Sequence, residues 1–130
     1  MAHQTIHPDG WLPAKGYANG ILTKDGTLHI GGQIGWDKNK HFVAEDFIGQ
    51  MQQALQNIRD IVEAAGGKVE DVTRLTWFVT SKKEYLEAQA EVGHAYRKIF
   101  GRHFPAMSLV VVSELVEDQA KVEIEATAHI

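Results

Sequence analysis

Three side chains in this sequence are suited to moving protons: Tyr17, His94 and Glu123. Glu123 is the most suggestive of them, because it interrupts an apolar strand pattern and would face a subunit interface there. Burial removes water from a carboxylate and raises its pKa, which suits a general acid or base. The fold must bring these groups to the candidate ligand-contacting residues, which are Gly31, Gly32, Trp36, Arg102 and His103.

The segment FGRHFPAMSLVVV, residues 100–112, places Arg102 and His103 directly before a proline and an apolar strand pattern. A loop that opens a strand is a common place for a binding pocket, because connections carry function on a rigid scaffold. Two interpretations stay open at this point. The segment is either an anion-binding corner, or a helix end followed by a proline stop and a strand start.

Other members of the set also have structural alternatives. A glycine pair inside a strand can mark a β-bulge, and it also lets a ligand or another backbone approach closely. Tyr17 could be an aromatic residue at a hairpin edge. Trp36 could fill a subunit interface instead of walling a pocket.

Metal and nucleotide sites are not supported by the sequence. Glu123, Glu125 and His129 share one strand face, but the first and last are too far apart on an extended strand to hold one ion. The motif GGQIG at residues 31–35 lacks the lysine of a phosphate loop and sits on a strand. The chain has no cysteine, which excludes thiol catalysis. We therefore expect no metal and no cofactor.

Composition limits the class of protein further. The length of 130 residues suits a single domain, residues 1–130. A content of 44% hydrophobic and 23% charged residues is ordinary for a globular fold. The net charge of −4 comes from interspersed acids and bases without a basic stripe, so no nucleic-acid partner is expected. No apolar run approaches the ~18 residues of a membrane span, and no signal peptide is recognisable. We expect no membrane partner and a cytoplasmic location.

The elements that must position the candidate residues follow from hydrophobic periodicity. Two extended runs flank Asp25-Gly26, which is a strong hairpin signal. An amphipathic helix should follow and end at Gly66-Gly67. Its apolar stripe consists of Phe47, Met51, Leu55, Ile58, Val62 and Ala65. A strand from about 72 to 80, a helix from about 82 to 100 and two C-terminal strands complete the order β-β-α-β-α-β-β.

This order predicts an α+β fold, with a single mixed β-sheet covered on one face by two helices. Both faces of the middle strands carry apolar residues: Leu75, Trp77 and Val79 on one, Val72 and Phe78 on the other, and the whole run 109–112. Two helices cover only one face, so the other should pack against a second copy and give a homo-oligomer. The alternative is a face shielded by loops.

The motifs GYANG, LHIGGQIGWD, QALQNI with AAGG, FPAMS and VEIEATA, in this order, resemble the Rid family. These are the reactive intermediate deaminases of the YjgF type, often labelled translation-inhibitor or L-PSP-like endoribonucleases. The resemblance covers nearly the whole chain, from Tyr17 to Ala128. It implies chorismate-mutase-like domains assembled as homotrimers, with ligand clefts between subunits. It also implies cofactor-free hydrolysis of small reactive enamines or imines, such as 2-aminoacrylate.

The family pattern is only partly retained in this chain. Tyr17 and Glu123 are kept, as an aromatic wall and a water-orienting carboxylate. Met107 stands where active members have a carboxylate-binding arginine, Gly31 where they have a serine, and Gly93 where they have a helix asparagine. The resemblance therefore implies an arginine-lacking subgroup with a roomier, more apolar cleft, in which Met107 contacts the ligand.

Two functions stay open from the sequence. The first is a deaminase, in which Glu123 orients water, Tyr17 and Trp36 wall the pocket, and His94 or His103 assists proton transfer. The second is a non-catalytic module that binds a small ligand in the same cleft. A ribonuclease, the older family label, is disfavoured by the acidic net charge.

Overall fold

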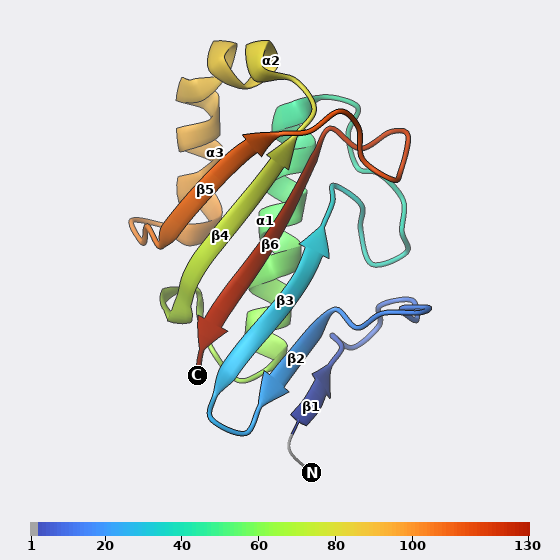
Figure 1. Ribbon diagram of the computed structural model, residues 1–130, viewed down its shortest axis with the longest axis vertical. Coiled ribbons are helices and arrows are strands. Elements are labelled where there is room, and N and C mark those ends of the chain that lie inside the picture. The colour runs from blue at the N-terminus through green and yellow to red at the C-terminus, as the bar shows by residue number, and fades with distance from the viewer. Residues whose placement is uncertain (1–2) are drawn as a thin grey trace.

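A six-stranded mixed β-sheet forms one layer of the protein, and the helices lie together against one of its faces (Figure 1). The computed structural model describes residues 3–130. The strand order is β1-β2-β3-β6-β4-β5, and β4 and β5 are parallel while the other neighbours are antiparallel. The elements are β1 His3–Ile6, β2 Gly20–Thr23, β3 Thr27–Gln33, α1 Phe47–Ala64, the 3₁₀ helix η1 Val69–Asp71, β4 Val72–Val79, α2 Lys82–Glu87, α3 Gln89–Phe100, β5 Ala106–Val111 and β6 Val122–His129.

This architecture confirms the predicted fold class, a single mixed sheet covered on one face by two main helices. Two details differ from the expectation. Strand β1 adds an edge to the sheet beside β2, and its four largely exposed residues were too few to show a period in the sequence. The second predicted helix is divided at Ala88, whose φ of −109° and ψ of 13° are not helical. None of the described helices is long and apolar enough to cross a membrane.

The hairpin predicted around Asp25-Gly26 is present, with Leu22 opposite Leu28. Gly26 has a φ of +95°, in the left-handed region that glycine adopts without strain. The Asp25 carboxylate accepts hydrogen bonds from the Thr23 hydroxyl and from the backbone N–H of Thr27. These hydrogen bonds stabilise the charged form and lower the pKa of Asp25 to about 2.

Helix α1 packs its apolar stripe against the sheet, as predicted. The stripe residues that are fully buried are Met51, Leu55, Ile58 and Val62. The Asp46 carboxylate caps the N-terminus by accepting the backbone N–H of Gly49 at 3.4 Å. At the other end Gly66 has a φ of +91°, and the N–H of Gly67 donates to the carbonyl of Val62 at 3.0 Å. This is a Schellman motif, so the predicted glycine stop is confirmed.

The two faces of the sheet separate largely as the alternation of side chains requires. In β6, Val122, Ile124, Ala126 and Ala128 are buried under the helices. The prediction for Val72 was wrong, because this residue is also buried on the helix side. The register between β4 and β6 shifts between Val72 and Arg74, and this irregularity reverses the alternation at the start of β4.

The face that the helices leave uncovered carries both apolar and acidic residues. Phe78 alternates with buried Trp77 and Val79, and it lies between Val110 of β5 and Glu123 of β6. Val110 is 43% exposed in the single chain. The predicted contact of this face with a second copy stays a prediction.

Helix α1 approaches the segment after β3 so closely that residue 35 must be glycine. A Cβ atom at Gly35 would lie 2.6 Å from both the Cα and the Cβ of Gln50. We expect Gly35→Ala to lower the free energy of unfolding by about 1–3 kcal/mol, the usual cost of overpacking. Urea denaturation measures this change.

Gly93→Ala is the matched control for this substitution. Gly93 lies inside α3, and the nearest neighbour of an added Cβ is the flexible guanidinium of Arg97 at 3.2 Å. The control should raise the free energy of unfolding by about 0.5–1 kcal/mol, since alanine is the better helix residue. A Gly35→Ala protein as stable as the wild type would contradict the packing described.

Candidate functional site

The C-terminal end of β3 borders a pocket that collects five of the predicted site residues: Tyr17, Gly31, Gly32, Trp36 and Glu123. We call it the β3 pocket, and its remaining lining residues are Ala18, Asn19, Gln33, Ile34 and Glu117. Its volume is about 350 Å³, within the range of small-molecule sites. The fold therefore assembles most of the predicted site from segments far apart in the sequence.

A β-bulge at Gly31 and Gly32 shapes one side of the pocket. Ile30 pairs with Ala126, and Gln33 pairs with Ile124. Three residue steps along β3 therefore lie opposite two along β6, and this extra residue is the bulge. A Cβ atom on Gly32 would lie only 2.1 Å from Oε2 of Glu123. The Glu123 carboxylate thus lies over the backbone of Gly32, in space that any other residue would fill.

Glu123 is half-buried on the face of the sheet that the helices leave uncovered. Burial raises the pKa of the Glu123 carboxyl above its ordinary value, and the neighbouring charge of Glu125 raises it further. A carboxylate whose pKa is raised is a stronger base than an exposed one. This is the property that general acid–base chemistry needs.

Tyr17 and Trp36 stand on the aromatic side of the β3 pocket. Asn57 of α1 holds the chain at Trp36, because its Nδ2 donates to the Trp36 carbonyl at 2.8 Å. The ammonium of Lys40 lies 5.8 Å from the ring centroid of Tyr17 and 5.8 Å from that of Trp36. Both distances are within the range of a cation–π interaction.

Buried amides connect the Tyr17 segment to β3. The Nε2 of Gln33 donates to Oδ1 of Asn19 at 3.2 Å and to the carbonyl of Gly31 at 3.2 Å. The backbone N–H of Gly31 donates to the carbonyl of Asn19 at 2.9 Å. Because Gln33 and Asn19 are buried, losing either amide would remove a buried hydrogen bond that water cannot easily replace. This network holds the segment before β2 against the bulge.

Met107 lies in a different hollow of about 350 Å³, which we call the β5 groove. The groove is lined by Trp77, Tyr85, Gln89, Val92, Gly93, Tyr96, Phe104, Met107 and Leu109. Met107 pairs with buried Leu75 and so faces the helix side, whereas Glu123 pairs with Phe78 on the uncovered side. Met107 and Glu123 therefore cannot contact one small ligand within a single chain.

Three other predicted residues also lie away from the β3 pocket. His94 is exposed on α3, in a shallow hollow between α3 and α1. Arg102 is exposed in the turn after α3. The Nε2 of His103 forms a hydrogen bond with the carbonyl of Val72 at 2.7 Å. In the single chain, residues 100–112 are a helix end, a proline stop and a strand start.

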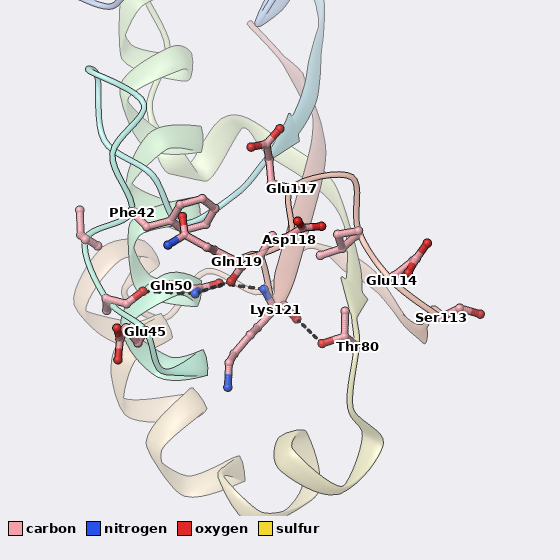
Figure 2. Close-up of a pocket in the computed structure, with 14 residues that line it drawn as sticks. Phe42, Glu45, Gln50, Thr80, Ser113, Glu114, Glu117, Asp118, Gln119 and Lys121 are labelled. Carbon is pink, nitrogen blue, oxygen red and sulfur yellow. Dashed lines mark hydrogen bonds between the residues drawn. The ribbon is translucent and has the colours of Figure 1, made fainter.

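A larger opening of about 720 Å³ lies between the loop before α1 and the loop between β5 and β6 (Figure 2). Gln50 joins the two loops, because its Nε2 donates to the carbonyls of Ala44 at 3.2 Å and Gln119 at 3.0 Å. Its Oε1 accepts the backbone N–H of Lys121 at 2.8 Å. Glu117 borders both this opening and the β3 pocket, so Gln50 anchors the loop that brings Glu117 to the site.

The acidic residues around this opening do not form a metal site. They are Glu45, Glu114, Glu117 and Asp118. Within residues 3–130, no group of three His, Asp or Glu side chains is close enough to hold a metal ion. Lys121 is the one basic residue lining the opening, and its Nζ forms a salt bridge with Oε2 of Glu84 at 3.1 Å. The described geometry therefore assigns no metal ligand.

Comparison with known proteins identifies the family. Residues 10–130 match the family described as endoribonuclease L-PSP. The chain belongs to this family. A 2-iminobutanoate/2-iminopropanoate deaminase of Salmonella typhimurium is 43% identical over 100 residues, which are 75% of this chain and 74% of that protein. Membership of the L-PSP family confirms the family resemblance seen in the motifs.

Solved structures agree with this assignment. The crystal structure of the YjgF gene product from E. coli is 36% identical, with a TM-score of 0.81 over 97% of this chain and 98% of that one. E. coli TdcF with bound serine is 30% identical, with a TM-score of 0.82 over 98% of each chain. The arginine-lacking subgroup within the L-PSP family stays a prediction.

Sequence reasoning missed two charged residues at the site. Lys40 lies in the turn DKNK, where the aspartate and asparagine are a turn signal but nothing indicates the aromatic neighbours. Glu117 lies in a loop of ten residues between β5 and β6, and its place depends on the contacts of Gln50 with that loop. Only tertiary packing could reveal either residue.

We expect Gly32→Ala to displace the Glu123 carboxylate toward solvent, because the end of a side chain moves more easily than the strand. The pKa of Glu123 should then fall toward its ordinary value. Titration of the Glu123 carboxyl carbon by NMR measures this shift. Gly31→Ala is the matched control, since its Cβ would approach the carbonyls of Ala18 at 3.3 Å and Asn19 at 3.8 Å but not Glu123. An unchanged Glu123 pKa in Gly32→Ala would refute this geometry.

Proposed function

We propose that this chain hydrolyses a small reactive imine or enamine in the β3 pocket and releases ammonia. The observation that carries the proposal is the half-buried Glu123 carboxylate, which lies over Gly32 in a pocket with two aromatic walls. Support also comes from the relative named as a 2-iminobutanoate/2-iminopropanoate deaminase. The reaction needs water and a proton shuttle, and the proposal includes no cofactor.

Glu123 suits the proton transfers of this reaction. As a base it accepts a proton from water while the water oxygen bonds to the imine carbon. Glu123 returns this proton to the imine nitrogen, which gives a carbinolamine. The hydroxyl proton of the carbinolamine then passes to its nitrogen, the C–N bond breaks as the C=O bond forms, and ammonia leaves. The net change converts one imine and one water into one carbonyl compound and one ammonia. The raised pKa of Glu123 favours both accepting and returning the proton.

The site is completed, in this proposal, by a second subunit of a homotrimer. Met107 and Glu123 lie on opposite faces of the sheet, so the β5 groove of one subunit must face the β3 pocket of its neighbour for both to contact one ligand. We infer an arginine-lacking subgroup from Met107, which stands in place of an arginine. The apolar exposed Val110 supports burial of the uncovered face.

Several sequence predictions remain at this stage. Roles for His94, Arg102 and His103 stay predictions, and each would need a neighbouring subunit to reach Glu123. The single domain over residues 1–130 and the cytoplasmic location also stay predictions. A non-catalytic module that binds a ligand in the same pocket is the alternative function, and it would leave Glu123 as a binding group.

We expect Glu123→Gln to lower kcat by about 10²- to 10⁴-fold, the usual contribution of a general acid or base. Release of pyruvate and ammonia from 2-aminoacrylate, generated in the cuvette, measures the rate. In the wild type, kcat/KM should depend on an ionisation above 4.5, because burial raises the pKa of Glu123 from that ordinary value. That ionisation should be absent in the variant.

Glu125→Gln is the matched control for this experiment. Glu125 lies on the same strand face but is exposed, so its removal should change kcat by only a few-fold. A Glu123→Gln protein as active as the Glu125→Gln protein would contradict the catalytic role. A wild-type protein that does not accelerate the reaction would favour the binding module.

The homotrimer is tested by sedimentation equilibrium, which should give three times the chain mass of 14.5 kDa. Val110→Asp should dissociate it, because a third carboxylate would then face the interface beside Phe78 and near Glu123. Leu86→Asp is the matched control, since Leu86 is similarly exposed, at 49%, but lies on α2. A wild-type monomer would overturn the proposed assembly.

A further inference from the structure

Lys40 places a positive charge beside the aromatic walls of the β3 pocket. Its ammonium lies 5.8 Å from the ring centroids of Tyr17 and Trp36, and both rings border the pocket. The ammonium donates to the carbonyl of Pro13 at 3.0 Å, its one hydrogen bond among the described residues. A lysine ammonium has three donors, so two remain for a ligand.

The turn that carries Lys40 is tightly held. The Asp37 carboxylate accepts the backbone N–H groups of Asn39 at 2.9 Å and His41 at 3.1 Å. The N–H of Lys40 donates to the Asp37 carbonyl at 2.9 Å. Lys40 is the one non-glycine residue with positive φ, +61°, in residues 3–130. Such backbone costs about 1–2 kcal/mol and persists where the surrounding structure requires it.

The charged side chains that line the β3 pocket are acidic. Glu117 and Glu123 are the acidic lining residues, and no Lys, Arg or His of residues 3–130 belongs to the lining. Arg102 and His103 lie elsewhere, and Met107 is apolar. Lys40 lies outside this lining, and its ammonium is within cation–π distance of the two aromatic walls.

A 2-imino acid has the matching pattern of charges. It carries a carboxylate on one carbon and, when protonated, a cationic nitrogen on the next. When each charge of a ligand faces an opposite charge of the protein, the ligand binds in a defined orientation. The acidic residues can face the nitrogen while Lys40 faces the carboxylate.

We propose that Lys40 binds the carboxylate of a 2-imino or 2-enamino acid at the aromatic side of the β3 pocket. This proposal rests on the proposed function and adds a residue that binds its substrate. Lys40 acts as a binding residue here and takes no part in proton transfer. It supplies the positive charge that Met107 does not.

The first experiment compares wild type, Lys40→Met, Lys40→Arg and Lys38→Met with 2-iminopropanoate as substrate. Lys40→Met should raise KM by about 10- to 100-fold, the effect of a lost charge-assisted hydrogen bond, while kcat changes little. Lys40→Arg should retain most of the affinity. Lys38→Met is the matched control, because Lys38 is an exposed lysine of the same turn. Equal KM values in Lys40→Met and Lys38→Met would overturn this inference and leave the proposed function standing.

The second experiment measures binding without turnover. The stable product 2-oxobutanoate and its uncharged amide, 2-oxobutanamide, are titrated into the same proteins by calorimetry. Lys40→Met should weaken binding of the oxo acid about tenfold or more, as loss of a charge-assisted contact predicts, and leave binding of the amide unchanged. If wild type does not hydrolyse imines but shows this pattern, the proposed function fails and the carboxylate site stands.

Three binding results would overturn the role of Lys40. An equal loss of affinity for the oxo acid and for the amide would show that Lys40 only positions Tyr17 and Trp36. Absence of oxo-acid binding to the wild type, or binding that Lys40→Met does not change, would remove the carboxylate site altogether. Higher salt should weaken oxo-acid binding to the wild type more than to Lys40→Met.

Discussion

The contact between the Glu123 carboxylate and the backbone of Gly32 organises the candidate site. The carboxylate occupies the volume of a missing side chain, and the bulge at Gly31 and Gly32 bends β3 at this point. Partial burial there raises the pKa of Glu123. The chemistry proposed for the site therefore depends on a glycine in a strand, where glycine otherwise weakens the sheet.

Buried amides fix the irregular segments around this contact. Gln33 and Asn19 hold the segment that bears Tyr17, Asn57 holds Trp36, and Gln50 holds the loop that bears Glu117. Each amide satisfies backbone or side-chain groups that would otherwise be buried without partners. These hydrogen bonds fix three loops to the sheet and to α1. A site made mostly of loops can therefore keep a defined shape.

Much of the fold could be predicted from the sequence, because its signals are local. The stripe of α1, the glycine stop at Gly66 and the Asp25-Gly26 hairpin each depend on residues close together in the chain. Val72 was misplaced because the irregularity at the start of β4 depends on its register with β6. The break at Ala88 and the short strand β1 likewise lack a local signal.

The sequence alone determined the family and the sheet with its two helices, and it proposed Tyr17, Trp36 and Glu123 as candidate site residues. Only the tertiary structure decided which candidates meet. Side chains alternate across a strand, and register sets which face each one occupies. That register puts Met107 and Glu123 on opposite faces of the sheet, and a turn stabilised by Asp37 puts Lys40 beside the aromatic walls. Such placements arise from contacts between distant segments, which no local pattern in the chain records.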